Sequence, residues 1–195
     1  MTAAKTLILV FHPALARSKA NAALATAAAA LPDTDVVDMQ ALYPDGVVDA
    51  DREVARLLAA DRIVLQFPIY WYSTPPLLKA WQDAVLTRMY YIAYEAEGRR
   101  LEGTPILVAA TAGNQPDAYS PTGRNLFPLE TLLSPLQATA YRCGLPWASP
   151  FLVYRSGVLN DAERAEAAAR YAARIDNWRR ETSGRSVATV ETEQA

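Results

Sequence analysis

Five short runs of apolar and β-branched residues recur along the chain with the spacing of an alternating α/β protein. They comprise residues 6–11, 34–39, 62–67, 105–111 and 147–154. The first run, Thr6 to Phe11, shows no alternation of polar and apolar positions, which is typical of a strand covered by helices on both faces. The pattern therefore predicts five strands in a largely parallel sheet.

Helical stretches separate these runs. The predicted helices comprise residues 18–30, 51–58, 76–89, 129–143 and 160 to about 182. Residues that typically cap or end a helix stand at their ends. The residues expected to bound these helices are Ser18, Thr74, the capping-box pair Asn160 and Glu163, and Gly144.

This alternation predicts a doubly wound α/β fold, and no break in composition or internal repeat divides it. We expect one domain over residues 1–182 and a polar, disordered tail over residues 183–195. In such sheets ligands bind beyond the carboxyl ends of the strands, near the switch in strand order. The loops at residues 12–18, 68–73 and 112–120 should therefore converge on one crevice.

Composition narrows the function. With a net charge of -2 and 21% charged residues, the chain has no general attraction to nucleic acid, which we exclude as a partner. The apolar stretch after Lys5 is broken by His12 and Pro13, so it is too short for a secretory signal. Because no apolar run approaches the ~18 residues that span a bilayer, we expect a cytoplasmic protein.

Cys143 is the only cysteine and His12 is the only histidine. No disulfide can form within the chain and no Cys/His metal cluster can be assembled, so we predict no metal site. Cys143 is expected to be a buried, inert thiol. The chemistry of an enzyme with this composition would come from a cofactor.

The first loop, which follows the first strand, is suited to a phosphate. No G-x-G or P-loop motif occurs in the chain. A helix N-terminus offers free N–H groups and partial positive charge, Ser18 and Asn21 add donors, and His12 or Arg17 can add a cation. The alternative, that Ser18 is only a helix cap and His12 a solvated residue, is equally compatible with this segment.

The second loop, residues 68–73, places three aromatic residues directly after a central strand, where solvent normally selects polar residues. The residues in question are Tyr70, Trp71 and Tyr72, which follow Pro68 and Ile69. An isoalloxazine ring could cover them; an aromatic subunit interface is the alternative, and both can hold together.

The third loop begins with Thr111, Ala112, Gly113 and Asn114, where the backbone could approach a ring edge closely. Tyr119 would then reach the substrate. Its phenol could donate a hydrogen bond to an oxygen that gains negative charge during hydride transfer, although a packed loop tyrosine fits the spacing nearly as well.

These residues resemble the NAD(P)H:quinone oxidoreductases of flavodoxin-like fold, particularly small bacterial members that include ancillary flavoproteins of glutathione-gated potassium-efflux systems. The likeness spans residues 5 to about 180. Its most specific block is residues 67–81, with support from His12-Pro13, from Ser18 with Ala20-Asn21, and from residues 134–139 and 143–145.

The resemblance implies a strand order of 2-1-3-4-5 and a set of flavin contacts. It places the flavin phosphate on His12, Ser18 and Asn21, the isoalloxazine ring on residues 68–72 and on residues 111–114, and makes Tyr119 the active-site tyrosine. Three positions depart from the family: Ala112 and Asn114 interrupt its T-T-G-G run, and Asn125 stands where some animal members have a histidine beside the reacting oxygen.

The resemblance also implies an activity and partners. We expect FMN, with FAD as the alternative, NADH or NADPH as hydride donor, and a quinone or similar acceptor in a two-step exchange. The competing possibility is a regulatory flavin-binding subunit that docks on a membrane transporter. A homodimer is expected from the family and from a cluster of large residues that one helix face cannot bury: Trp81, Met89, Tyr90, Tyr91 and Tyr94.

Overall fold

The computed structural model describes residues 4–182, which form a five-stranded parallel sheet in the order β2-β1-β3-β4-β5. The predicted fold class and strand order are confirmed. The strands are β1 Thr6–Val10, β2 Thr34–Asp38, β3 Arg62–Pro68, β4 Ile106–Thr111 and β5 Phe151–Val153. β1 and β3 pair at the centre of the sheet and are buried along their whole length. The predicted tail, residues 183–195, lies outside the described residues.

β5 is shorter than the predicted strand at residues 147–154. Trp147 makes only an isolated bridge to Ile106, and pairing with β4 resumes at Phe151. Pro150 stands between these two contacts and has no N–H group to donate to the ladder. The proline therefore delays the start of the regular strand.

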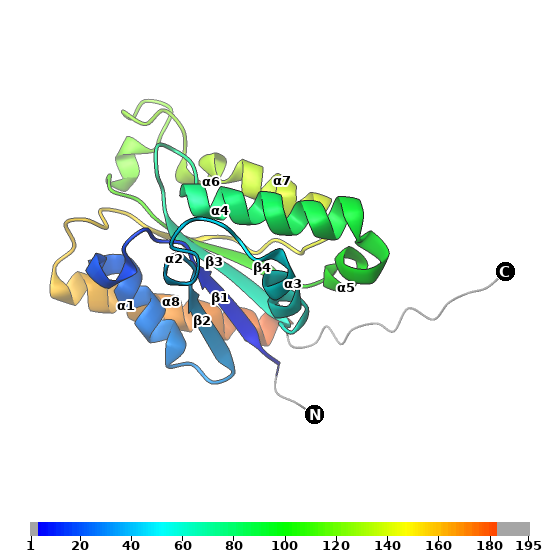
Figure 1. The fold of residues 1–195 in the computed structure, drawn as a ribbon. Helices are drawn as coiled ribbons and strands as arrows, with labels where there is room; N and C mark the ends of the chain where they lie inside the picture. The colour runs from blue at the N-terminus through cyan, green and yellow to red at the C-terminus, as the bar shows by residue number, and fades with distance from the viewer. Residues whose placement is uncertain (1–3, 183–195) are drawn as a thin grey trace.

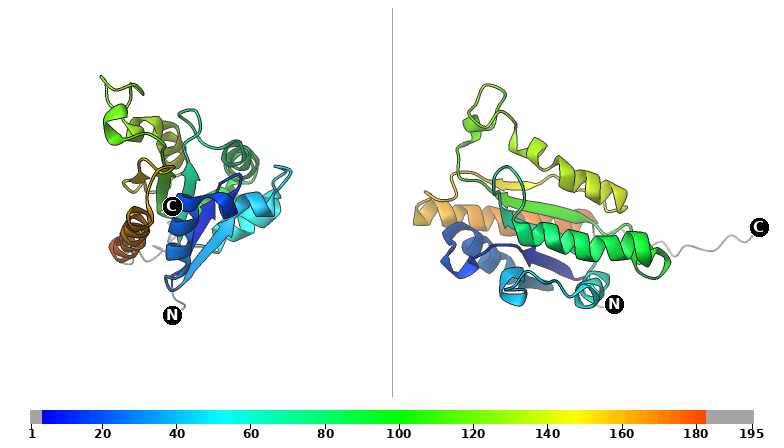
Figure 2. Two further views of the ribbon diagram at one scale, coloured as in Figure 1. Left: turned by 90° about the vertical axis from the view of Figure 1, so that its left-hand side faces the viewer. Right: turned by 45° about the horizontal axis from the view of Figure 1, so that its top comes forward.

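Helices cover both faces of the sheet. They are α1 Lys19–Ala29, α2 Met39–Leu42, α3 Ala50–Leu58, α4 Pro76–Trp81, α5 Arg99–Leu101, α6 Leu129–Leu132, α7 Ser134–Arg142 and α8 Asp161–Thr182. α1 and α8 lie on one face, and α3, α4 and α7 on the other (Figures 1 and 2). Successive side chains of β1 point to opposite faces of the sheet. Leu7 and Leu9 pack toward α3, α4 and α7, and Ile8 and Val10 pack toward α1 and α8.

Three of the predicted helix ends are confirmed. The Oγ atom of Ser18 accepts the N–H of Asn21 at 3.1 Å. Asn160 and Glu163 form a reciprocal capping box, each side chain accepting the other's backbone N–H, at 2.9 and 2.8 Å. Gly144 ends α7 with a φ of 64°, a left-handed conformation that favours glycine.

Two helix predictions are wrong. Thr74 lies one residue outside the cap of α4, a position occupied by Pro75, and no side chain caps this helix. The predicted helix at residues 129–143 is divided into α6 and α7 at Leu133. The break has a simple cause, since Pro135 has no N–H to bond the carbonyl of Thr131, four residues earlier.

The helix predicted over residues 76–89 is regular only as far as Trp81. It continues as three π-helical turns, Gln82–Leu86, Arg88–Ile92 and Tyr94–Gly98, before α5. At the end of this segment a Cβ atom on Gly98 would lie 2.5 Å from the carbonyl oxygen of Met89. Only glycine fits this close approach of backbone to backbone.

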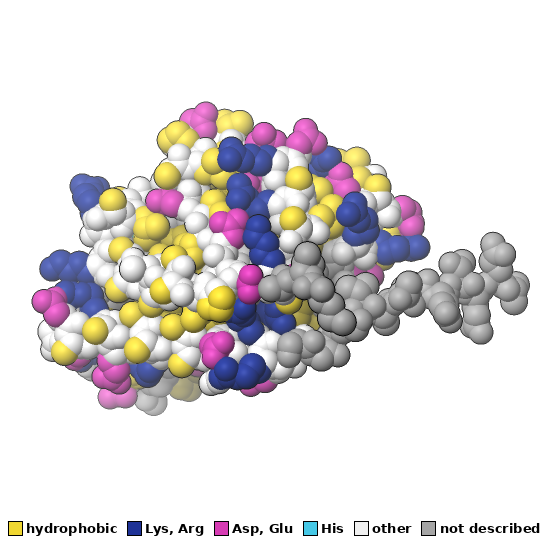
Figure 3. All heavy atoms as spheres, turned by 90° about the horizontal axis from the view of Figure 1, so that it is seen from below, with side chains coloured by type: hydrophobic (Ala, Val, Ile, Leu, Met, Phe, Trp, Pro, Cys, Tyr) yellow, Lys and Arg dark blue, Asp and Glu magenta, His cyan; other side chains and the backbone are white. Residues whose placement is uncertain are grey.

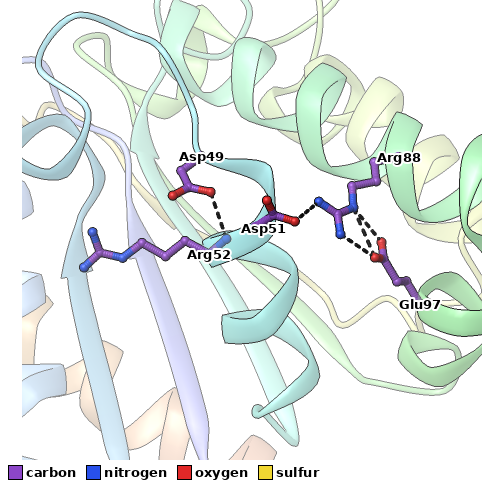
Figure 4. Close-up of polar contacts among 5 residues, drawn as sticks. All are labelled: Asp49, Asp51, Arg52, Arg88 and Glu97. Atoms are coloured by element: carbon purple, nitrogen blue, oxygen red, sulfur yellow. Dashed lines mark hydrogen bonds and ion pairs between the residues drawn. The ribbon is translucent and has the colours of Figure 1, made fainter.

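A charged cluster fastens this segment to α3 (Figure 4). The guanidinium of Arg88 donates to Glu97 at 2.6–3.1 Å and also pairs with Asp51 in the first turn of α3. Hydrogen bonds to Glu97 and then to Asp51 hold the pKa of Arg88 above its usual value. Asp49 caps α3 by accepting the N–H of Arg52 at 3.0 Å. The cluster therefore joins α3 to the chain that follows α4.

The face seen from below carries a mixture of charges. Lys and Arg side chains lie close to Asp and Glu, and hydrophobic side chains form small groups (Figure 3). Within residues 4–182, none of the helices has the length and apolar character needed to span a bilayer.

Candidate functional site

The loops that follow β1 and β3 line a cavity of about 580 Å³ at the carboxyl edge of the sheet, together with Thr111 at the end of β4. The predicted third loop, residues 112–120, does not line this cavity. The predicted binding residues that line this cavity are His12, Arg17, Ser18, Asn21, Pro68, Tyr70 and Thr111. The cavity lies beside the switch in strand order between β1 and β3, where doubly wound sheets bind ligands.

One end of the cavity is built for an anion, and we call it the anion pocket: residues 12–21. After a 3₁₀ turn, Leu15–Arg17, helix α1 points its N-terminus at the cavity. Ser18 satisfies the N–H of Asn21, which leaves the preceding N–H groups of Lys19 and Ala20 without a partner in the helix. The exposed cations of Arg17 and Lys19 add positive charge.

His12 contributes a neutral donor to the anion pocket. Its Nδ1 atom accepts the N–H of Ala14 at 3.0 Å, so the ring proton of the neutral form is on Nε2. Partial burial lowers the pKa of His12, although the negative charge of Asp38 opposes this shift. The permanent cations are therefore Arg17 and Lys19.

The floor of the cavity is a buried polar network. The amide of Asn21 donates to Thr111 Oγ1 at 2.9 Å, and Gln66 Nε2 donates to the backbone carbonyl of Asn21 at 2.9 Å. All three residues are at most 2% exposed. In this arrangement the side chain of Asn21 fastens α1 to β4, while its predicted contact with a phosphate stays a prediction.

Gln66 was not among the predicted site residues. The available signal was a single amide inside the apolar run of β3, where a polar side chain needs a partner. The sequence also did not reveal Ser156 and Gly157, which follow β5 and line the cavity. Their loop is fixed to the third loop by the N–H of Ser156, which donates to the carbonyl of Ala112 at 3.0 Å.

The aromatic loop after β3 is a tight, strained turn. Tyr70 and Ser73 exchange two backbone hydrogen bonds of 2.9 Å, and Trp71 and Tyr72 between them have φ values of 44° and 65°. Non-glycine residues rarely adopt this left-handed backbone conformation, which costs on the order of 1–3 kcal/mol. Residues strained in this way are concentrated at functional sites. Trp71 is 93% exposed. The structure therefore brings Tyr70, but not Ile69, Trp71 or Tyr72, to the cavity.

The remaining predicted residues lie outside this cavity, in the third loop and beside it. Ala112 is buried and its N–H donates to the carbonyl of Val153 at 2.8 Å, whereas Gly113 is exposed and has open space around its Cα atom. Asn114 Nδ2 donates to Asn125 Oδ1 at 3.4 Å, and Tyr72 donates its hydroxyl to the same atom at 3.4 Å.

Tyr119 belongs to the same group of side chains. We call Tyr72, Asn114, Tyr119 and Asn125 the tyrosine cluster. The ring of Tyr119 is half-buried and lies 5.7 Å from the ring of Tyr154. Burial raises the pKa of Tyr119, and a backbone hydrogen bond at Asn114 offsets part of this shift. Its hydroxyl is therefore protonated at neutral pH and available as a donor.

Together the fold and the site define a doubly wound α/β protein with a ligand cavity at the switch point of its sheet. The chain belongs to the flavodoxin-like fold family, which it matches over residues 4–175.

Similar proteins include an oxidoreductase, a transporter-associated protein and a solved flavin complex. The chain is 40% identical over 173 residues to the uncharacterized NAD(P)H oxidoreductase YdeQ of Bacillus subtilis, covering 89% of this chain and 87% of that protein. It is 36% identical over 172 residues to the glutathione-regulated potassium-efflux system ancillary protein KefF of Klebsiella pneumoniae, covering 88% and 95%. The structure of general stress protein 14 from Treponema denticola in complex with FMN is 33% identical, with a TM-score of 0.80 and coverage of 89% and 98%.

Proposed function

We propose that this protein is a flavin-dependent NAD(P)H oxidoreductase that reduces a quinone or a similar small acceptor by two electrons. The observation that carries the proposal is the cavity itself, which is lined by the N-terminus of α1 and by Pro68 and Tyr70 of the loop after β3. Relatives named as an NAD(P)H oxidoreductase and as an FMN complex support this assignment.

The residues of the cavity fit FMN. Its phosphate would be held by the free N–H groups at the start of α1, by Ser18 and by the cation of Arg17. Its ring system would lie against Pro68 and Tyr70, the second of which keeps 41% of its surface exposed. The cavity volume of about 580 Å³ lies within the usual range of ligand sites. FMN is preferred to FAD because the structure of general stress protein 14 from Treponema denticola is a complex with FMN.

When bound, the flavin would supply the redox step by accepting a hydride from NAD(P)H and returning it to the acceptor. The chain supplies orientation and a protonated phenol at Tyr119, which would donate a hydrogen bond to an oxygen that gains negative charge.

The most direct test is to release the bound small molecule from purified protein by heat and to identify it by chromatography. We expect FMN. Initial rates of NAD(P)H oxidation at several quinone concentrations should give parallel lines in double-reciprocal plots, because donor and acceptor would use the same place in turn. Absence of any flavin, or intersecting lines, would contradict the proposal.

A homodimer is part of the proposal, but most of the large residues that were expected to need a partner subunit do not need one. Trp81, Met89 and Tyr90 are buried within the chain, so they leave nothing for a partner to cover. Tyr91 is 73% exposed, and Tyr141, on α7, is 89% exposed. A second copy would bury these two rings. A sedimentation mass near 21.3 kDa at micromolar concentration would refute the dimer.

A second candidate function is a regulatory subunit of a potassium-efflux transporter, in which turnover is incidental. The likeness to the KefF ancillary protein favours it. The two functions are separated by two measurements made together. Co-purification with a transporter, combined with negligible NAD(P)H oxidation on a panel of quinones, would favour regulation over catalysis.

A further inference from the structure

The loop between β5 and α8, residues 154–160, forms part of the cavity wall, and we call it the β5 loop. Ser156 and Gly157 of this loop line the cavity together with residues of the anion pocket. Both segments lie at the carboxyl edge of the sheet, because each follows a parallel strand and leads into a helix. The two helices, α1 and α8, lie side by side on the same face of the sheet (Figures 1 and 2). The β5 loop is therefore a neighbour of the anion pocket.

The backbone holds the β5 loop in a defined conformation. The N–H of Arg155 donates to the carbonyl of Asn114 at 3.0 Å, and the N–H of Ser156 donates to the carbonyl of Ala112 at 3.0 Å. Arg155 has a φ of 56°, which is strained for a residue other than glycine. The N–H of Val158 donates to the carbonyl of Arg155 at 2.9 Å and closes the turn. These contacts fix Ser156 beside the end of β4 without using its side chain.

The hydroxyl of Ser156 is free to bind a ligand. The residue is half-buried, and within residues 4–182 its hydroxyl makes no hydrogen bond. A serine hydroxyl offers one donor and two acceptor lone pairs, so it can bind an oxyanion. Because Ser156 lines the cavity, a molecule bound there would meet an unused donor.

A chain of contacts joins the start of α1 to the β5 loop. Asn21, in the first turn of α1, donates to Thr111 at the end of β4 at 2.9 Å. Thr111 pairs with Val153 of β5, which stands three residues before Ser156. The first turn of α1 and Ser156 are therefore neighbours across the end of β4.

The charges at the two helix starts indicate which part of a ligand would lie here. α8 has a closed capping box and two carboxylates in its first turn, Asp161 and Glu163, so its N-terminus is already neutralised. α1 has no acidic residue in its first turn, and the cations of Arg17 and Lys19 line the same cavity. A negatively charged group is therefore directed to the start of α1, next to the β5 loop.

We propose that the hydroxyl of Ser156 donates a hydrogen bond to the phosphate of the bound flavin nucleotide. The inference rests on the proposed function and adds to its phosphate site a donor from near the far end of the chain. The donor is uncharged and transfers no proton. The phosphate would then be held by the loops after both β1 and β5, which enclose it between α1 and α8.

Ser156→Ala tests the inference with two flavins that differ in the phosphate. Riboflavin has the ring and the ribityl chain of FMN but no phosphate group. We expect the variant to raise the Kd for FMN about tenfold, close to the lower limit for a hydrogen bond to a charged group, and to leave the Kd for riboflavin unchanged. The change in flavin fluorescence on addition of full-length protein freed of flavin measures both constants.

A matched control removes a hydroxyl outside the cavity. Ser149→Ala, at an exposed position just before β5, should change neither Kd. An equal loss of affinity for FMN and for riboflavin in Ser156→Ala would overturn the inference, because the loss would then come from the ring, the ribityl chain or the loop itself. Wild-type affinity for both flavins in that variant would overturn it as well.

Phosphorus NMR of the FMN-loaded proteins examines the contact directly. The phosphate signal of bound FMN should shift in Ser156→Ala relative to the wild type, and it should stay in place in Ser149→Ala. An unshifted signal in Ser156→Ala would reject the inference while leaving the flavin assignment intact. Wild-type protein that binds neither FMN nor riboflavin would instead reject the proposed function, so the two failures are distinguishable.

Discussion

The anion pocket and the tyrosine cluster are neighbours at one edge of the sheet, but they are built in different ways. The anion pocket rests on a capped helix and on a buried floor with hydrogen bonds of 2.9 Å. The tyrosine cluster has side-chain hydrogen bonds of 3.4 Å and an unpaired amide, and its surroundings include non-glycine residues with positive φ. The first region has short hydrogen bonds, although Gln66 Oε1 in its floor has no partner, whereas the second has longer hydrogen bonds, positive φ values and an unpaired amide donor.

The difference follows from what each region would bind. A phosphate is held by fixed dipoles and charges, which work best when they are already in place. A flat ring is held by surfaces, and its reacting oxygens change charge, so the groups around it must satisfy two states of the ligand. Strain in the second region is therefore compatible with function, while strain in the first would only weaken binding.

The largest effect that would test this comparison is expected from Tyr119→Phe, in the tyrosine cluster. The change keeps the ring but removes one hydrogen bond to a charge-developing oxygen, worth about 1.5–3 kcal/mol, or roughly 10- to 100-fold in rate. Stopped-flow reduction and reoxidation of the flavin measure it, and flavin affinity and melting temperature should barely change. Tyr154→Phe is the matched control, because the two rings are neighbours. Wild-type rates for both half-reactions would make Tyr119 a packing residue.

A somewhat smaller effect, and on stability instead of rate, is expected from Asn21→Leu in the floor of the anion pocket. The substitution leaves the buried hydroxyl of Thr111 without its partner, so the free energy of unfolding should fall by about 2 kcal/mol even without flavin. Urea denaturation measures this. Thr26→Ala, at an exposed position of the same helix, should change stability by less than about 0.5 kcal/mol. An equal loss in both variants would mean that the floor is not a preformed network.

A change of about 1 kcal/mol is expected at Trp71. Glycine adopts the positive φ of this position without strain, whereas alanine retains the strain. Both substitutions remove the indole ring, so the difference between them reports the backbone strain. Trp71→Gly should therefore be more stable than Trp71→Ala by about 1 kcal/mol in thermal unfolding. Equal stabilities would show that the aromatic turn is unstrained, and the contrast between the two regions would then be lost.

The smallest effect is expected in the core, where the buried thiol of Cys143 should not react with a thiol reagent in the native protein. Burial raises the pKa of the Cys143 thiol to about 11, so its thiolate is scarce at pH 8. Native protein should therefore resist labelling by a thiol reagent, while protein unfolded in guanidinium chloride should be labelled rapidly. Because a raised pKa favours the neutral thiol, native labelling should increase only as the pH approaches 11. Rapid labelling at pH 8 would show that the core opens readily.

The sequence predicts much of the fold because each central strand is apolar at successive positions and each loop carries its own turn residues. β1, β3 and β4 were predicted within a residue of their ends. The errors involve prolines, at Pro135 and Pro150, where one missing N–H decides between continuing an element and ending it. The π-helical turns after Trp81 depend on tertiary contacts such as the Arg88 cluster, which no local pattern reveals.

The candidate site was predictable only where it is local in sequence. Ser18 caps the helix that follows it, so its role can be read from the adjacent residues. Gln66 and Ser156 reach the site through contacts between segments that are far apart in the chain. Their roles depend on the arrangement of the strands, which brings those segments together.

The packing of α1 against α8 has a consequence for how the chain folds as it is made. The two helices lie side by side although they are near opposite ends of the described chain (Figure 1). The apolar face of α1, with Leu24, Ala25 and Ala28, belongs to the same hydrophobic cluster as Tyr171 and Ile175 of α8. During synthesis this face of the sheet, which α1 covers only in part, must therefore remain incompletely covered until α8 has been made. Chains released before α8 are expected to be substrates for chaperones and proteases, not shortened versions of the protein.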